Sequence, residues 1–432
     1  MIISKYFKKN LINKINLKEV IKNMGWLIVD KLIRALLGIT VGAWVARYLG
    51  PSQYGEIAYC ISFISLFQAI ANLGMDGIVV RELSNETKNK NNILGTVFQL
   101  RIFAGVICWI ISVILFIYIS KEINNTDIKI LILIGSTLLF QAADTVDLWF
   151  QSEIKSKRTV IAKIIGYMIS NALKVVMVIM EMQLISFALI ISIESLINAI
   201  ALYKSYKKYP TNGKWNLDKK IAKLLILESW PYIVSGMSIM IYIRIDQIMI
   251  KNLLNNTSLG IYAAILPLST IWNIIPIIIC SSIAPTMAKK NLRNEIEFKN
   301  ILTLIFRLMI ISSLVISLTT VVFSSNIINL LYGRLYSEAS NILNIYIFTN
   351  IPIFLGVTQS LWMINKKKSH LSIIQTMSGA VMSIVGNLIL IPIYGLKGAA
   401  FSAVISQLTS VILINYVFEK KLFLMQLGIK GK

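Results

Sequence analysis

Long apolar stretches alternate with short polar stretches along the whole chain. Each apolar stretch has at least 20 residues, and at about 1.5 Å per residue a helix of that length crosses a hydrocarbon core about 30 Å thick. Backbone groups in lipid must be hydrogen-bonded within their own segment, as in a helix, and the strict alternation typical of a membrane barrel is absent from the sequence. The pattern therefore predicts twelve transmembrane helices. They cover residues 24–46, 55–80, 93–119, 129–150, 160–180, 184–203, 224–250, 259–285, 301–323, 340–362, 371–392 and 398–418.

The composition agrees with an all-α polytopic membrane protein that lies in the lipid bilayer. Hydrophobic residues make up 56% of the 432 residues and charged residues 15%, which leaves too little polar surface for a soluble protein of this length. The formal net charge is +23, a value that in a soluble protein would first suggest nucleic acid as a partner. Because most of these basic residues lie in short loops between apolar stretches, membrane topology explains them, and we expect no nucleic-acid partner.

The basic residues are divided unequally between the two sides of the predicted membrane. Of the 43 Lys and Arg residues, 31 lie in the N-terminal segment, the even-numbered loops and the C-terminal tail, and six lie in the odd-numbered loops. The first set includes Lys163, which is counted with the loop of residues 151–163. By the positive-inside rule, both termini of the chain are predicted to lie in the cytoplasm.

Two halves are predicted, joined by one polar loop. Residues 1–23 are basic and amphipathic, and we interpret them as a cytoplasmic surface segment rather than a cleaved signal peptide. The loop of residues 204–223 contains Pro210 and falls midway along the chain. We therefore place an N-lobe at residues 24–210 and a C-lobe at residues 211–432.

The starts of the two halves resemble each other weakly. When Trp26 is aligned with Trp230, Gly55 falls on Gly260 after one inserted residue. Six spans in each half give the halves the same orientation, so they would be related by an axis along the membrane normal. This arrangement predicts two six-helix lobes around a central cavity.

Few residues of the sequence suit catalysis or metal binding. Cys60, Cys108 and Cys280 all lie in apolar stretches and His370 is the single histidine, so neither a disulfide framework nor a metal site is indicated. The loops are too short for a catalytic domain, and no paired carboxylates indicate a membrane sugar polymerase or a glycosyltransferase. We therefore expect no enzyme activity, no cofactor and no metal.

Several short motifs occur in an order that resembles the Wzx-type polysaccharide (oligosaccharide) flippases. These belong to the multidrug/oligosaccharidyl-lipid/polysaccharide exporter superfamily, whose fold is MATE-like. The motifs are "ARYLGPSQYG" at 46–55, "LWFQSEIKSKR" at 148–158, "RIDQIMI" at 244–250, "LGIYAAI" at 259–265, "LLYGRLYSEASNIL" at 330–343 and "NLILIPIYGLKGAA" at 387–400. The resemblance implies a flippase of the bacterial inner membrane that moves an undecaprenyl-diphosphate-linked oligosaccharide, such as an O-antigen or capsular repeat unit, to the periplasmic leaflet. It also implies a polysaccharide polymerase and chain-length proteins as partners.

Ionisable residues inside the predicted spans are the candidate functional residues, because a charge in the membrane is costly. Fixed Lys and Arg side chains could bind the diphosphate of the implied substrate. The predicted substrate-binding cations are Lys31, Arg34, Arg244, Arg307 and Lys174, and the predicted ion-pair or ion-coupling residues are Asp30 and Asp246. Purely structural roles stay open for several of these residues, since Lys31 could extend to the cytoplasmic edge of the membrane and Asp30 and Arg34 could simply neutralise each other.

Structural ion pairs are the alternative for Lys174 and the better explanation for a further cation, Arg101. Lys174 could pair with Glu194 across the short hairpin between the fifth and sixth spans. Arg101 could pair with Asp144 or Asp147 at the cytoplasmic side of the third and fourth spans.

The sequence also bears on the energy source of transport and on two rival functions. No Walker-type phosphate loop is present in the sequence, so we expect transport to be coupled to a cation, either a proton or sodium. A multidrug or metabolite exporter of the same superfamily would share the fold but should favour acidic residues in its cavity. A lipid II flippase is closer in chemistry, and the twelve predicted spans and the motifs disfavour it.

Overall fold

The computed structural model describes residues 17–85, 89–119, 125–209, 214–293, 295–366, 368 and 370–429. Within this part of the chain all regular structure is helical, which confirms the predicted all-α class. The helices of the first half are α2 (Leu17–Ala71), α3 (Asp76–Asn85), α4 (Lys90–Ile119), α5 (Asn125–Gly135), α6 (Thr137–Phe140), η1 (Gln141–Ala143), α7 (Asp144–Ser152), α8 (Ser156–Ile179) and α9 (Leu184–Lys207).

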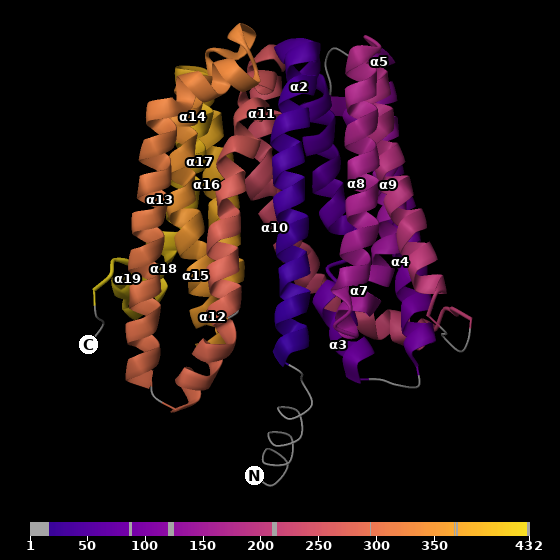
Figure 1. Ribbon diagram of the computed structural model, residues 1–432, viewed down its shortest axis with the longest axis vertical. Helices are drawn as coiled ribbons and strands as arrows, with labels where there is room; N and C mark the ends of the chain where they lie inside the picture. Colours follow the sequence, from indigo (N-terminus) through magenta and orange to yellow (C-terminus); the bar gives the residue numbers. More distant parts are fainter. Residues whose placement is uncertain are drawn as a thin grey trace.

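The second half begins with α10 (Lys219–Leu253) and ends with the short helix α19 (Lys420–Gln426). Between them lie α11 (Asn256–Thr270), η2 (Ile271–Asn273), α12 (Ile274–Arg293), α13 (Glu295–Leu331), η3 (Arg334–Tyr336), α14 (Ala339–Tyr346), η4 (Ile347–Thr349), α15 (Asn350–Lys366), α16 (His370–Tyr394), α17 (Leu396–Leu408), the π-helical turn η5 (Thr409–Leu413) and α18 (Ile414–Phe418). Figure 1 shows the long helices of both halves nearly parallel, with the first half on the right and most of the second half on the left.

Eleven helical segments of the described residues are long and apolar enough to cross a membrane. The first of them, Gly25–Asn85, joins what the sequence predicts as the first and second spans. The backbone is not helical at Gly50, where φ is 71° and ψ is 169°, and Pro51 follows. A positive φ is accessible to glycine at little cost, so Gly50 and Pro51 together break the helix at the predicted turn. The multi-pass helical class is thus confirmed, while the count of twelve helices stays a prediction.

The hydrophobic core is continuous between the halves at one end of the molecule. The largest cluster of buried side chains combines Ala46 and Ile57 of α2 with Ile261 of α11 and Ile342 of α14. A second cluster lies within the second half, around α13 and α15. The third cluster lies within the first half and also includes Leu225 from the start of α10.

The start of α10 is therefore packed against the first half of the chain. Asp218 caps α10 by accepting hydrogen bonds from the backbone amides of Lys220 and Ile221, and its own amide donates to Thr96 Oγ1 at 2.9 Å. The predicted lobe boundary at residues 210/211 lies outside the described residues. Most of the N-terminal segment 1–23 does so too, since α2 is described from Leu17.

Candidate functional site

A cavity of about 590 Å³ lies between the two halves of the molecule. Its walls come from α2, α10, α11, η2, α12 and α14. The side chains that line it include Lys31, Arg34, Tyr54, Ala58, Arg244, Gln247, Pro267, Asn273 and Tyr346. A cavity between two repeats is where membrane transporters commonly bind their substrates.

The charged side chains on the wall of this cavity are all basic. Lys31 and Arg34 come from α2 and Arg244 comes from α10, so both halves contribute positive charge. None of the described residues that line the cavity is acidic. Guanidinium and ammonium groups held in a membrane cavity favour an anionic ligand, since they form charge-assisted hydrogen bonds to phosphate or carboxylate oxygens.

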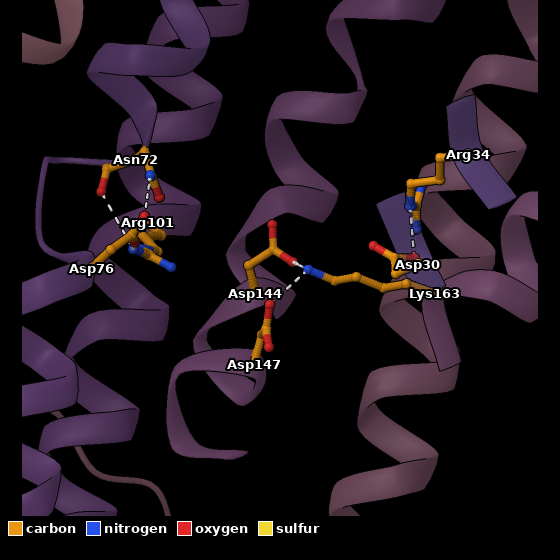
Figure 2. Close-up of polar contacts among 8 residues, drawn as sticks. All are labelled: Asp30, Arg34, Asn72, Asp76, Arg101, Asp144, Asp147 and Lys163. Carbon is orange, nitrogen blue, oxygen red and sulfur yellow. Dashed lines mark hydrogen bonds and ion pairs between the residues drawn. The ribbon is translucent and has the colours of Figure 1, made fainter. Parts of the chain in front are cut away.

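Arg34 lies between the central cavity and a smaller polar pocket within the first half. Its Nε donates a hydrogen bond to Asp30 Oδ1 at 2.9 Å, one helical turn earlier, as Figure 2 shows. Its guanidinium carbon lies 4.8 Å from the centroid of the Tyr167 ring on α8, a cation–π contact. The smaller pocket, of about 330 Å³, is lined by Asp30, Arg34, Asp144 and Lys163 among others. Arg34 therefore contributes to the walls of both cavities.

Arg244 and Asp246 point in different directions, because residues two apart on a helix face different sides. Arg244 lines the cavity, and its buried Nε has no hydrogen-bond partner among the described residues. Asp246 is buried, and its Oδ2 accepts a hydrogen bond from the Tyr262 hydroxyl at 2.6 Å. The Tyr262 ring in turn meets the ring of Tyr346, which lines the cavity, edge to face at 5.7 Å.

The other two predicted cations are placed differently. Arg307 of α13 is not among the residues that line the cavity, and its Nε donates to the carbonyl oxygen of Gly428 at 2.9 Å. Lys174 pairs with Glu194 at 3.8 Å, and Glu194 also accepts a 2.6 Å hydrogen bond from Ser170. The predicted Lys174–Glu194 pair is thus confirmed.

The predicted partner of Arg101 is wrong. Arg101 is buried and forms its ion pair with Asp76, at the start of α3 (Figure 2). Asp144 and Asp147 instead both contact the ammonium group of Lys163 on α8, each at 2.8 Å. The reason is the break in the chain before α3, where Leu73 and Gly74 both have positive φ and turn Asp76 towards α4. The topology count assigns Lys163 to a loop. It also lies within the apolar stretch that begins at residue 160, and this position in the sequence indicates that Lys163 belongs to the fifth span.

One end of the cavity is closed by a tight crossing of α2 and α11. A Cβ atom added to Gly55 would lie 1.9 Å from the carbonyl oxygen of Asn256, and one added to Gly260 would lie 1.8 Å from that of Pro51. Gly55 and Gly260 are the two glycines that the repeat alignment places at equivalent positions. Close backbone approach of this kind requires glycine.

Two hydrogen bonds between the halves accompany this crossing. The Tyr336 hydroxyl donates to the carbonyl oxygen of Ala46 at 2.8 Å, and Ser62 Oγ donates to Gln247 Oε1 at 2.7 Å. Lys31 and Arg34 lie nearer the beginning of α2, away from the crossing. The cavity is therefore closed at the end of the molecule where Gly55 lies.

Comparison with known proteins relates the chain to polysaccharide biosynthesis proteins. Residues 20–291 match the family model described as polysaccharide biosynthesis protein. A relative from Staphylococcus aureus, named capsular polysaccharide biosynthesis protein CapF, is 22% identical over 414 residues, which cover 94% of this chain and 100% of the relative.

Solved structures with the same fold are transporters and a flippase. The lipid II flippase MurJ in an inward closed conformation has a TM-score of 0.68 at 16% identity, with 94% of this chain and 91% of MurJ covered. An inward-facing multidrug resistance MATE family transporter of the MOP superfamily has a TM-score of 0.66 at 13% identity, with 94% and 95% covered. At these identities the likeness shows the fold.

Proposed function

Because the chain belongs to the polysaccharide biosynthesis protein family, we propose that it is a flippase for an undecaprenyl-diphosphate-linked oligosaccharide. It would move this lipid from the cytoplasmic to the periplasmic leaflet of a bacterial inner membrane. The substrate would be an O-antigen or capsular repeat unit. The observation that carries the proposal is a central cavity whose charged lining residues, Lys31, Arg34 and Arg244, are all basic and come from both halves.

The charge of the cavity separates this function from its rivals. A multidrug exporter for cationic compounds would need acidic residues where the described wall has three basic ones. A lipid II flippase would also carry a lipid diphosphate, and the fold shared with MurJ keeps it as the second candidate. The two differ in the glycan, so the sugar attached to the diphosphate decides between them.

In an alternating-access cycle, the closed end of the cavity would be the end that opens to release the substrate. Gly55 and Gly260 follow the first and seventh loops, which the topology prediction places in the periplasm. On that prediction the crossing lies on the periplasmic side of the membrane and the start of α2 on the cytoplasmic side. In the inward-facing state that this assignment implies, Arg34 and Arg244 would receive the diphosphate from the cytoplasmic leaflet. Separation of α2 from α11 would open the same cavity to the periplasm.

Coupling to a cation is assigned to the two aspartates near the cavity cations. Asp246 is buried with a tyrosine as its hydrogen-bond partner, an environment in which gain or loss of a cation changes the local charge strongly. Asp30 pairs with Arg34 at 2.9 Å and would compete with the substrate for its guanidinium group. We assign Arg307 and Lys174 supporting positions outside the cavity, consistent with their contacts to Gly428 and Glu194.

The test is a leaflet-resolved transport assay in proteoliposomes. The lipid-linked oligosaccharide is labelled with a membrane-impermeant sugar reagent from one side, with and without the protein. We expect label to become accessible on the far side only with protein, and Arg244→Gln to slow this at least tenfold, since one charge-assisted hydrogen bond contributes about 1.5–3 kcal/mol. Arg334→Gln, which removes an exposed arginine that is not among the cavity-lining residues, is the matched control. If Arg244→Gln and Arg334→Gln transport the lipid-linked oligosaccharide at the same rate, the proposed site is contradicted. If the wild-type protein transports lipid II as fast as the oligosaccharide, the second candidate is favoured.

A further inference from the structure

A separate apolar pocket of about 680 Å³ lies between α4, α7 and α9 of the first half, and Trp215 from the segment before α10 completes its wall. It shares no lining residue with the central cavity. The described residues that line it are Phe98, Ala143, Val146, Ala199, Ile200, Tyr203, Tyr206, Lys207, Tyr209 and Trp215. Half of them are aromatic and one is charged, which is unlike the polar wall expected of a sugar or ion path.

The aromatic rings that form this pocket are fixed by contacts with one another. The Trp215 ring meets those of Phe98 and Tyr206 edge to face at 5.5 and 5.3 Å, and its Nε1 donates to the Tyr206 hydroxyl at 3.1 Å. Behind them the buried Trp149 meets Tyr206 at 5.1 Å and Tyr209 at 5.4 Å. The wall is thus preformed, so a ligand that enters it loses little free energy to the ordering of these side chains.

The mouth of the pocket is apolar and accessible. Ile200 is 44% exposed and Tyr203 is 61% exposed, both on α9 near its C-terminal end. In a membrane protein exposed apolar side chains of a spanning helix contact lipid, and Tyr and Trp gather where hydrocarbon meets the headgroups. A mouth formed by Ile200 and Tyr203 fits the boundary between acyl chains and headgroups.

One cation lines the pocket, and two more contact Tyr209, one of its lining rings. Lys207 lines the pocket, the Lys155 ammonium lies 5.0 Å from the centre of the Tyr209 ring, and the Arg158 guanidinium carbon lies 5.8 Å from the same point. The nearby acidic Glu153 is already paired with Lys90 at 2.6 Å. The rim consequently presents positive charge next to an apolar pocket.

We propose that this aromatic pocket binds one anionic phospholipid. An acyl chain would lie among the aromatic rings, and the headgroup phosphate would be held by Lys207, Arg158 and Lys155. A single pocket that offers hydrocarbon and basic groups side by side fits a molecule with both parts, and clusters of basic residues at the cytoplasmic membrane surface attract anionic lipids. Since Tyr209 and Trp215 lie on either side of the connection between the two halves, the bound lipid stabilises the protein at this connection.

The experiment compares lipid retention by purified full-length protein in native mass spectrometry, with phosphatidylglycerol or phosphatidylcholine added. The variant Arg158→Gln/Lys207→Gln removes two charges at the pocket. The control Lys420→Gln/Lys421→Gln removes two exposed charges from the C-terminal helix α19. We expect wild type and control to retain one bound lipid molecule, and to retain phosphatidylglycerol more strongly than phosphatidylcholine. In the pocket variant we expect the apparent affinity for phosphatidylglycerol to fall roughly thirtyfold. Each basic residue near an anionic membrane surface contributes about 1 kcal/mol, and the variant lacks two.

A second variant tests the apolar part of the pocket. Tyr203→Ala leaves all three cations in place and removes an exposed ring from the mouth, so folding should be unaffected. We expect it to lower phosphatidylglycerol retention and to reduce the rise in unfolding temperature that this lipid gives to wild type. Undiminished retention in the charge variant, or an equal loss in the α19 control, would overturn the proposal. None of these outcomes depends on which substrate the central cavity transports.

Discussion

Replacement of Asp30 by asparagine tests how the central cavity releases its substrate. In the structure Asp30 accepts a hydrogen bond from Arg34 at 2.9 Å, and Arg34 also lines the central cavity. Substrate diphosphate and the Asp30 carboxylate would therefore compete for one guanidinium group. Asp30→Asn keeps the shape and an acceptor oxygen but removes the competing charge, so Arg34 becomes more available to the substrate.

The size of the effect follows from the exposure of the pair. The side chains of Arg34 and Asp30 are 30% and 20% exposed. Fully exposed pairs four residues apart on a helix contribute about 0.3–0.5 kcal/mol, and hydrogen bonds to charged groups about 1.5–3 kcal/mol. A partly buried pair lies between these limits, at about 1 kcal/mol. Its loss predicts that Asp30→Asn binds the substrate about fivefold more tightly.

Transport should change in the opposite direction. With no carboxylate to receive Arg34 after release, the empty cavity keeps an uncompensated positive charge, and its return to the inward-facing state is slowed. The assay is paired, with binding of the lipid-linked oligosaccharide to purified protein and export of surface glycan in cells. Glu295→Gln, which removes an exposed carboxylate that pairs with Lys366 at 3.0 Å, is the control and should leave both readouts unchanged.

Two outcomes would refute this reasoning. If Asp30→Asn loses binding and export together while the protein remains in the membrane at normal levels, then Asp30 contacts the substrate or supports the fold. Competition for Arg34 would then not be the release mechanism. Wild-type behaviour in both readouts would equally exclude it, since the ion pair would have no role in the cycle.

Three further predictions concern the closed end, an internal ion pair and the topology. Gly55→Ala places a Cβ 1.9 Å from the Asn256 carbonyl oxygen and should lower the unfolding temperature and glycan export, whereas Gly42→Ala, where a Cβ meets nothing within 4 Å, should leave both unchanged. Lys163→Ala leaves two aspartates without their shared ammonium group and should lower the free energy of unfolding by about 2 kcal/mol in a detergent unfolding experiment, with partial recovery in Lys163→Arg. Reporter fusions after Leu335 should be periplasmic and those after Lys208 cytoplasmic, and the reverse result at both positions would refute the positive-inside assignment.

Local features of the sequence determined the helical membrane class and most of the span boundaries. Length and hydropathy act within one segment, because each helix must satisfy its own backbone and bury its own side chains in lipid. The pair Lys174–Glu194 was predictable for a related reason. A short turn joins α8 and α9, so two long side chains that lie within a few helical turns of it on neighbouring helices can reach each other.

The partners of charges on distant helices depend on tertiary packing. Sequence gives the depth of a residue in the membrane but not which helices are neighbours at that depth. Arg101 could therefore be assigned to Asp144 or Asp147 at similar depth, although the packed helices give these aspartates to Lys163 and give Arg101 to Asp76. Likewise, the sequence singled out Arg34, Arg244 and Arg307 alike as buried cations. The packing of the helices separates them. Arg34 of α2 and Arg244 of α10 line one cavity, whereas Arg307 of α13 contacts Gly428 near the C-terminus.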